Sequence, residues 1–419
     1  MEKTLKPSLR FEGFTETWEQ RTIGDISRLV TKGTTPIDKS GDGTINYVKV
    51  ENIDSYSGEF SNLPKISEEE HNGYLRRSQL QDGDILFSIA GTLGRITTVS
   101  NTILPANTNQ ALAIIRLKEG NIRFIKTALK GKVVEDFVRR NPTVGAQPNL
   151  SLEQVKSLII DYPNNYEQSK IGTFFDKLDK LITLHQRKYD KLVNIKKALL
   201  DKMFPKNGEL VPRLRFKGFA EAWEQRELDD MCSIITKQTG FDYSATIKPS
   251  LLNEASEDTY AFIQNKDFDG ENINLNTDFH IPIEIAERFP KILLDKPSLL
   301  ITISGKIGNV GYYKLKNKSF IGGAVGICKL KKDNGSIIVH SLQSDEGQAY
   351  FHSLVKASSH SNITVEDIRK IKVCLPKAKI EEQKIVEIFS YVTSLITLHQ
   401  CKHEKLINIK KALLQKMFV

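Results

Sequence analysis

The chain has 419 residues, of which 39% are hydrophobic and 26% charged, which favours a folded protein of two or more domains over a disordered one. The net charge is +9, shared between the halves: residues 1–205 hold 30 basic and 25 acidic residues, and residues 206–419 hold 30 and 26. This excess suits a long polyanion such as DNA, and it equally describes an ordinary basic surface. The start, MEKTLKPSLR, has no apolar signal region, and no apolar run approaches the roughly 20 residues that cross a bilayer. We therefore expect a cytoplasmic protein with no membrane partner.

The first distinctive segment, LRFEGFTETWEQR at residues 9–21, recurs as LRFKGFAEAWEQR at residues 214–226. The only two tryptophans of the chain, Trp18 and Trp223, stand at matching positions in these openings. Exposed indole rings could stack on nucleobases, but packing of each opening against a helix is the more economical interpretation. Either way, an internal repeat begins at each opening.

The region after each opening contains short, apolar, β-branched runs bounded by Gly, Pro or Asn, which predict strands. These runs lie at residues 111–118, 157–163, 297–304 and 371–376, with helices expected around 121–139 and 341–356. The two regions match each other only faintly, through Tyr47 with Tyr260, Gly91 with Gly305, and Gly94 with Gly308. We predict two α+β domains that share a fold but present different surfaces.

Each half ends in a long amphipathic helix, and LITLHQRKYDKLVNIKKALLDKMF at 181–204 recurs as LITLHQCKHEKLINIKKALLQKMF at 395–418. A helix of roughly 38 residues is about 57 Å long, so its own domain cannot cover the whole apolar stripe. We predict that the two helices pair as an antiparallel coiled coil, related by a pseudo-two-fold axis. The predicted seam consists of Ile171, Leu178, Leu181, His185, Leu192, Ile195 and Leu199, and of Ile385, Val392, Leu395, His399, Leu406, Ile409 and Leu413.

The predicted fold class is thus α+β, with two tandem globular domains separated by two long antiparallel helices. The boundaries are residues 1–165 for the first domain, 166–205 for the central helix, 206–378 for the second domain and 379–419 for the C-terminal helix. The openings at 9–21 and 214–226 belong to the two domains.

Catalytic and metal-binding motifs are missing from the sequence. There is no G-x-x-x-x-G-K-[ST] loop, no Pro-Asp dipeptide of a nuclease and no N-P-P-[YF] or D-P-P-Y methylation motif. Cys232, Cys328, Cys374 and Cys401 form no C-x-x-C pair and indicate incidental reduced thiols. His185 and His399 fall on the helix seam, where a core histidine is a better interpretation than a metal ligand. We expect no metal, no cofactor and no catalytic residue.

The order of these parts resembles the specificity subunits of type I restriction-modification systems, which alternate variable domains with conserved helices. The resemblance covers essentially the whole chain. It depends on both L-R-F-x-G-F…W-E-Q-R openings, on I-G-x-F-F-x-x-L-D-x-L-I-T-L-H-Q at 171–186, and on N-I-K-K-A-L-L-x-K-M-F at 194–204 and 408–418. Two copies in this order are far more specific than a single glycine motif.

The resemblance implies that each α+β domain is a target recognition domain that reads one half of a bipartite, asymmetric site in double-stranded DNA. The helices would set the spacing of the half-sites. The implied partners are two methyltransferase subunits, which bind S-adenosylmethionine, and restriction or motor subunits, which use ATP and Mg²⁺. The chain itself would be a non-catalytic subunit.

Candidate DNA-binding residues are polar or basic side chains in loops, since direct readout needs such groups at the surface. The paired glycines at 91–95 and 305–309 allow a close approach to phosphate, although a tight turn explains them equally well. Polar loops are also mostly just solvated. The candidates are Lys32, Thr34, Thr35, Arg76, Arg77, Thr92, Arg95, Asn107, Asn109, Gln147, Asn149, Lys237, Gln238, Thr239, Gln264, Lys266, Lys306 and Asn309.

Two other classes of function remain open at this stage. The chain could be a two-headed scaffold whose helices join proteins without reading bases. It could also be an enzyme, although it lacks a catalytic constellation. Neither the recognised base sequence nor the gap between half-sites follows from the sequence.

Overall fold

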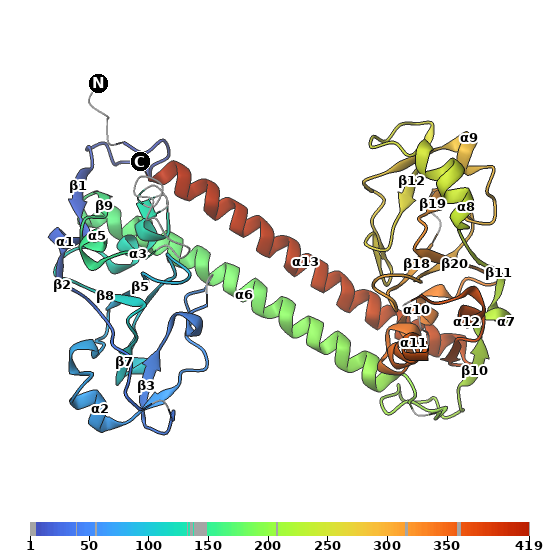
Figure 1. The fold of residues 1–419 in the computed structure, drawn as a ribbon, viewed down its shortest axis with the longest axis horizontal. Coiled ribbons are helices and arrows are strands. Elements are labelled where there is room, and N and C mark those ends of the chain that lie inside the picture. The colour runs from blue at the N-terminus through green and yellow to red at the C-terminus, as the bar shows by residue number, and fades with distance from the viewer. Residues whose placement is uncertain are drawn as a thin grey trace. The chain divides into compact units, whose positions relative to one another are not determined.

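The computed structural model describes residues 6–38, 40–54, 57–131, 133–134, 137, 149–206, 208–314, 317–357 and 362–418. Internal contacts divide the chain into two compact units. Unit 1 comprises Met1–Tyr189 with Leu398–Val419, and unit 2 comprises Asp190–Thr397. Each unit contains one α+β domain together with parts of both long helices, drawn in green and red in Figure 1.

The domain of unit 1 contains three sheets. The four-stranded sheet has the order β2-β8-β5-β6, the three-stranded sheet the order β4-β3-β7, and β1 pairs with β9. The strands are β1 (Glu19–Thr22), β2 (Ser27–Lys32), β3 (Ile45–Val48), β4 (Lys65–Ile66), β5 (Ile85–Ser88), β6 (Ile96–Thr98), β7 (Ala106–Thr108), β8 (Leu112–Leu117) and β9 (Ile159–Tyr162). The α-helices are α1 (Ile23–Ile26), α2 (Glu68–Asn72), α3 (Ile122–Lys130) and α5 (Leu152–Lys156), and short 3-10 turns are η1 (Val50–Asn52), η2 (Arg76–Ser78) and η3 (Asn101–Ile103).

Unit 2 repeats this arrangement with additions. Its four-stranded sheets have the orders β11-β20-β17-β18 and β15-β12-β19-β16, while β10 pairs with β21 and β13 with β14. The strands are β10 (Glu224–Glu227), β11 (Cys232–Lys237), β12 (Thr259–Ile263), β13 (Phe268–Asp269), β14 (Asn272–Ile273), β15 (His280–Pro282), β16 (Leu293–Leu294), β17 (Ser298–Thr302), β18 (Val310–Tyr313), β19 (Ser319–Ile321), β20 (Val325–Leu330) and β21 (Lys372–Leu375). The helical segments are α7 (Leu228–Met231), α8 (Gly240–Asp242), η4 (Tyr243–Ile247), η5 (Lys248–Ser250), α9 (Ile283–Ala286), α10 (Gly335–Gln343), α11 (Asp345–Ala357) and α12 (Val365–Arg369).

The strands predicted from apolar runs are confirmed as β8, β9, β17 and β21. The helix expected around 121–139 begins as α3, and residues 138–139 lie outside the described part of the chain. The helix expected at 341–356 is two helices, α10 and α11, because the chain turns at Ser344. The backbone of Ser344 is extended there, with φ −64° and ψ 162°.

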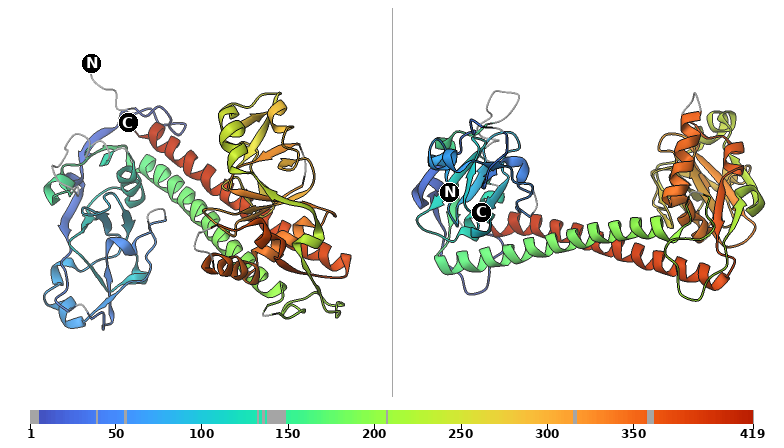
Figure 2. Two further views of the ribbon diagram at one scale, coloured as in Figure 1. Left: turned by 45° about the vertical axis from the view of Figure 1, so that its right-hand side comes forward. Right: turned by 90° about the horizontal axis from the view of Figure 1, so that it is seen from below.

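The two long helices are α6 (Asn165–Met203) and α13 (Lys379–Met417), each of 39 residues. Both helices begin within one residue of the predicted boundaries between domain and helix, at 165/166 and 378/379. In unit 1 the first part of α6 runs antiparallel to the last part of α13: Asp179 forms an ion pair with Lys410, and Phe175 contacts Phe418. Both views in Figure 2 show these two segments side by side. In unit 2 the end of α6 meets the start of α13 through Phe204 and Phe389, with ring centroids 6.0 Å apart. The predicted antiparallel pairing is therefore confirmed within each unit.

The seam differs from its prediction in its second row of residues. Ile171, Leu178, Ile385 and Val392 are buried as predicted, but Leu181, Ile195 and Ile409 are 46%, 38% and 40% exposed, so their assignment was wrong. The buried second row lies four residues after the first instead of three. It includes Phe175, Ile182 and Phe389. With 3.6 residues per turn, both spacings lie on one helix face, and the neighbouring domain decides which is covered. In unit 1, Ile171, Phe175, Leu178 and Ile182 of α6 belong to the core of their own domain, which Met417 of α13 also joins. The domain therefore covers part of the seam that was predicted to face the other helix.

The repeated opening fastens the start of one helix to the end of the other. In unit 1, Arg10 Nε and Nη2 donate to the Glu167 carboxylate over 2.7 Å each, in the first turn of α6. Trp18 Nε1 donates to the same carboxylate over 3.1 Å, and the indole packs edge-on against Phe418 at the end of α13. The Leu9 N–H donates to the Lys416 carbonyl oxygen over 2.9 Å. Trp18 is thus a packing residue, which confirms the expectation that the opening packs against a helix.

We call this set of contacts between an opening and two helices the clamp. Unit 2 has the same clamp with the two helices exchanged. Arg215 donates to Glu381 in the first turn of α13, over 2.6 and 2.9 Å. Trp223 packs edge-on against Phe204, which follows the end of α6, and the Leu214 N–H donates to the Lys202 carbonyl oxygen over 2.8 Å. Each opening binds both helices, which explains why the sequences of the opening and of the helix are both repeated with few changes.

Glu167→Ala is expected to lower the free energy of unfolding by about 3–5 kcal/mol, because it leaves a buried guanidinium and an indole N–H without their acceptor. The Glu167 side chain is fully buried and that of Arg10 is 12% exposed. Urea denaturation followed by far-UV circular dichroism measures this change. The control is Glu19→Ala, which removes an exposed ion pair with Arg21 and should cost less than about 0.5 kcal/mol. Equal losses in the two variants would contradict the clamp.

His185 and His399 meet where α6 and α13 pair in unit 1. Their Nδ1 atoms are 2.8 Å apart, so one ring donates and the other accepts, and at least one ring is neutral. Burial, followed by the positive charge that His399, Lys402, Lys188 and His403 would contribute, lowers the pKa of His185. Burial, followed by Lys188 and Lys402, lowers the pKa of His399. The folded state therefore favours the uncharged pair.

Acid should weaken the fold of unit 1 below about pH 6.5. Because the pKa of both histidines is lower in the folded than in the unfolded state, the unfolded chain binds protons first as the pH falls. The double variant His185→Asn, His399→Asn should lose less stability than the wild type between pH 7.5 and 5.5, measured as the urea midpoint. A residual loss is expected from His340 in unit 2, whose pKa is lowered to about 4 by burial. The exposed His352→Asn serves as control, and an identical pH response of the double variant and the wild type would contradict this role.

Candidate nucleic-acid interface

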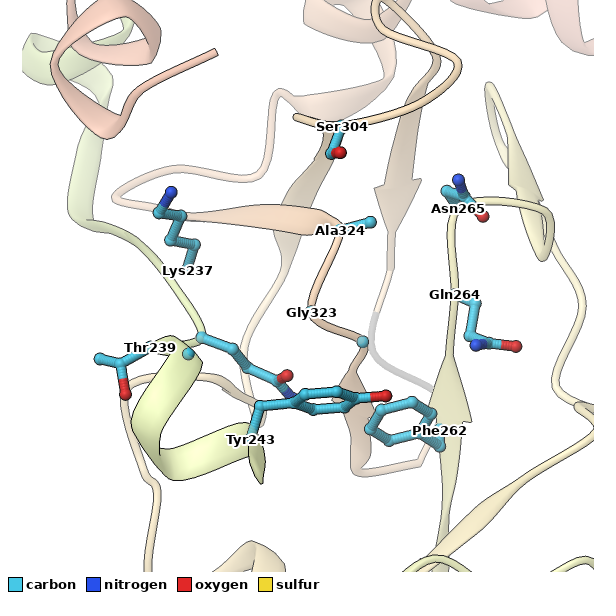
Figure 3. A pocket seen from close by; sticks show the side chains of 12 residues that line it. Lys237, Thr239, Tyr243, Phe262, Gln264, Asn265, Ser304, Gly323 and Ala324 are labelled. Atoms are coloured by element: carbon cyan, nitrogen blue, oxygen red, sulfur yellow. The ribbon is translucent and has the colours of Figure 1, made fainter. Parts of the chain in front are cut away.

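A hollow of about 460 Å³ opens at the surface of unit 2, at the ends of β11, β12 and β19. Lys237 and Thr239 stand on one side of it and Gln264 and Asn265 on the opposite side, with the rings of Tyr243 and Phe262 between them (Figure 3). The remaining lining residues are Gln238, Gly240, Ser304, Gly322, Gly323 and Ala324. The lining contains one cation, three amides and no carboxylate, which suits a polyanion with hydrogen-bonding groups.

Unit 1 has a hollow of about 320 Å³ at the corresponding ends of β3 and β7. It is lined by Thr35, Pro36, Asp38, Gly41, Tyr47, Lys49, Pro64, Lys65, Ile66, Asn109 and Gln110. The Tyr47 hydroxyl donates to the Thr34 carbonyl oxygen over 2.9 Å, and burial raises its pKa. This lining has two lysines, one aspartate and two amides, whereas that of unit 2 has one lysine, three amides and no carboxylate.

Backbone hydrogen bonds define which residues correspond between the hollows. The Asn109 N–H donates to the Val48 carbonyl oxygen over 3.2 Å, and the Gly322 N–H donates to that of Ile263 over 2.7 Å. Strand β3 is parallel to β7 as β12 is to β19. Val48 therefore corresponds to Ile263, and Tyr47 to Phe262. The sequence match of Tyr47 with Tyr260 was wrong by two residues, since faint similarity alone does not fix the register.

Six of the predicted residues line the two hollows. They are Thr35 and Asn109 in unit 1, and Lys237, Gln238, Thr239 and Gln264 in unit 2. Gln238 is only 5% exposed and its Nε2 donates to the Ile321 carbonyl oxygen, so it supports the wall of the hollow. The Thr239 hydroxyl accepts from the Asp242 N–H over 3.0 Å and caps α8. The predicted residues of the β11–α8 loop therefore line the hollow, and their contact with DNA stays a prediction.

Three of the candidates have internal roles instead. Asn107 is fully buried, and its Nδ2 donates to the Leu75 carbonyl oxygen over 2.8 Å, so it cannot contact DNA. Arg95 donates from Nη1 to the carbonyl oxygens of Val50 and Ile53, over 3.1 and 3.0 Å. Asn309 donates from Nδ2 to those of Asn265 and Phe268, over 3.0 and 2.8 Å. Arg95 in unit 1 and Asn309 in unit 2 therefore hold the loop that follows the strand beside each hollow.

The other candidates lie outside the two hollows. Thr34 is half-buried, and Lys266 forms an ion pair with Asp278. Gln147 lies outside the described residues. The exposed ones are Lys32, Arg76, Arg77, Thr92, Asn149 and Lys306.

The paired glycines have a backbone reason. The φ angles are +74° and +79° at Gly91 and Gly94, and +81° and +87° at Gly305 and Gly308. Residues with a Cβ rarely adopt this conformation, so the tight-turn interpretation is supported. Contact of these loops with phosphate stays a prediction.

Most of the residues that line the two hollows were not among the candidates. Lys49 and Lys65 in unit 1, and Tyr243, Asn265 and Ser304 in unit 2, line the hollows without having been singled out. Ser304 ends the run predicted as a strand at 297–304, and Lys49 and Asn265 follow β3 and β12 closely. The end of a strand was therefore the signal that could have found them.

Arg95→Ala should lower the free energy of unfolding by about 2 kcal/mol, because it frees two buried carbonyl oxygens from a charged donor. Asn309→Ala should cost about 1–2 kcal/mol for the same reason with a neutral donor. Chemical denaturation of both variants measures these losses. The exposed neighbour Lys306→Ala is the control, with a change within about 0.5 kcal/mol. Losses no larger than the control would mean that these residues do not hold the loops.

No group of three or more His, Cys, Asp or Glu side chains within the described ranges is arranged to hold a metal ion. Cys232 and Cys328 are buried and Cys401 is exposed, all as free thiols. Of the helices in the described part of the chain, none has the length and apolar character needed to cross a bilayer.

In comparisons with known proteins, both halves of the chain match the same family. Residues 15–194 and 220–408 match the family described as "Type I restriction modification DNA specificity domain". The chain is similar to the type I restriction enzyme MjaVIII specificity subunit of Methanocaldococcus jannaschii, with 22% identity over 95% of this chain and 91% of that protein. It shares 27% identity with the EcoBI specificity subunit of Escherichia coli over 48% and 43% of the two chains. The fold resembles that of a type I S subunit from M. genitalium, with a TM-score of 0.61 and 14% identity over 99% of both chains.

Proposed function

Because the chain belongs to the DNA specificity family of type I restriction-modification systems, we propose that it reads a bipartite, asymmetric DNA site, one half with each α+β domain. The observation that carries the proposal is the pair of corresponding hollows. The same strand ends build them in both units, but different side chains line them. One scaffold with two different linings is what recognition of two unlike half-sites requires.

The charge of the chain supports a DNA partner. Both halves carry a basic excess, and the hollow of unit 2 is lined by Lys237 without a carboxylate. Neutralised phosphates release counterions, so binding of this kind weakens steeply as salt rises. Lys32 and Lys237 end the equivalent strands β2 and β11, and both side chains are exposed. They are suited to phosphate contacts that position each domain without reading bases.

The long helices are proposed to set the gap between half-sites and to dock two methyltransferase subunits. Apolar side chains stay exposed at equivalent positions of the two helices: Leu184 and Leu398 at 44% and 45%, and Ile195 and Ile409 at 38% and 40%. Exposed apolar side chains on a helix mark a protein–protein surface when they recur in a pattern. Two copies of one pattern fit two copies of one partner.

The chemistry of the complex is assigned to the partner subunits. The methyltransferase subunits would bind S-adenosylmethionine, and the restriction or motor subunits would use ATP and Mg²⁺. This chain would contribute recognition and assembly in the cytoplasm and no catalytic residue.

The test uses the full chain with the methyltransferase subunits of its system and a library of random DNA duplexes. Selection should enrich two short motifs at a fixed separation. Duplication of residues 183–189 and 397–403 lengthens both helices by one heptad, about 10.5 Å. This should widen the gap by about three base pairs at 3.4 Å each and leave both motifs unchanged.

Each alternative gives a different result in this experiment. Binding without an enriched motif would favour the two-headed scaffold over a specificity subunit. Two motifs with an unchanged gap in the lengthened variant would leave half-site reading in place and reject the role of the helices as the spacer.

A further inference from the structure

Lys49 in unit 1 and Gln264 in unit 2 occupy equivalent positions in the walls of the two hollows. Their backbones make the same contacts, but their side chains differ. Val48 and Ile263 correspond, so the next residues, Lys49 and Gln264, correspond as well. The Lys49 N–H donates to Asn52 Oδ1 over 3.0 Å, and the Gln264 N–H donates to Asp267 Oδ2 over 2.9 Å. Both bonds span three residues and close the same turn, which supports the correspondence independently.

The loop that carries this position is held firmly in both units. Arg95 binds the carbonyl oxygens of Val50 and Ile53, and Asn309 binds those of Asn265 and Phe268. The side chain at position 49 or 264 therefore projects from a fixed backbone. A fixed backbone limits the conformational entropy that is lost when this position binds, which favours sequence discrimination.

The side chain at this position is accessible. Lys49 is 41% exposed at its side chain, and its ammonium lies 3.8 Å from the exposed Glu51 carboxylate. Such an exposed ion pair is weak and does not prevent Lys49 from binding another acceptor. Gln264 is half-buried at the side of its hollow that faces Lys237 (Figure 3). Both side chains end in hydrogen-bonding groups at the mouth of a hollow.

A second pair of equivalent positions has the same side chain in both units. Lys32 and Lys237 have the same charge at the ends of β2 and β11, where they pair with Ala113 and Gly326 of the neighbouring strands. A cation that is kept in both units suits phosphates, which are the same in every sequence. A side chain that changes between units suits bases, which differ between half-sites.

Resting on the proposed function, we propose that residues 49 and 264 occupy one specificity-determining position, which reads a G·C pair in unit 1 and an A·T pair in unit 2. Lysine has only donors and matches the O6 and N7 acceptors of guanine in the major groove. Glutamine has a donor and an acceptor and matches N7 and the N6 amino group of adenine.

Exchange of the two side chains tests this assignment. Lys49→Gln and Gln264→Lys are compared with the wild type, each in complex with the methyltransferase subunits, by selection from random duplexes. Lys49→Gln should change one position of one half-site from G·C to A·T. Gln264→Lys should change one position of the other half-site from A·T to G·C. The preference at each changed position should shift by about 10- to 100-fold, the range expected for one base contact.

Three controls accompany the exchange. Lys49→Arg should keep guanine, because arginine binds the same acceptors. Lys32→Gln and Lys237→Gln should weaken binding to all sequences and lower the salt dependence by about one counterion, with both motifs unchanged. Thermal unfolding of every variant checks that the fold is kept.

Unchanged motifs in both exchange variants would overturn the assignment, and so would weaker binding to the same motif. A change in both half-sites from one substitution would overturn it too, since each side chain belongs to one unit. A wild-type complex that selects no bipartite motif would instead reject the proposed function, and the assignment with it.

Discussion

Two buried carboxylates organise this protein. Glu167 and Glu381 each lie in the first turn of a long helix, and each accepts both hydrogen bonds of an arginine from a repeated opening segment. A carboxylate in the first turn also interacts favourably with the partial positive charge at a helix N-terminus. Since the same openings pack a tryptophan against the end of the other helix, each clamp joins three separate parts of the chain.

This arrangement separates what is constant from what varies. The clamp and the helix ends recur nearly letter for letter, while the two turns share only their glycines. The clamp fills buried places where few side chains fit. The walls of the hollows face solvent, so their side chains can differ without cost to the fold. Lys49 in one unit and Gln264 in the other stand on the same backbone for this reason. A chain built in this way can change what it reads while its scaffold stays the same.

The limits of sequence reasoning follow the same division. Strands and helices were predictable where apolar periodicity was strong, as in β8, β17 and the long helices. The seam was predicted with Leu181 and Ile195, but these are exposed, because periodicity alone cannot distinguish the third from the fourth residue on a helix face. Arg95, Asn107 and Asn309 resembled surface contacts by residue type. Their carbonyl partners lie 32 to 45 residues away in sequence, and only folding brings such groups together.

By itself the sequence determined the repeat, the α+β class, the antiparallel helices and the family, since all of these depend on local periodicity and on repeated text. Only the tertiary structure decided that each opening joins two helices, that Tyr47 corresponds to Phe262, and that Lys49 and Gln264 share one wall position. The physical reason is that a hollow is lined by residues from several strand ends far apart in the chain. Their meeting depends on strand register and side-chain packing, which no single segment of the sequence specifies.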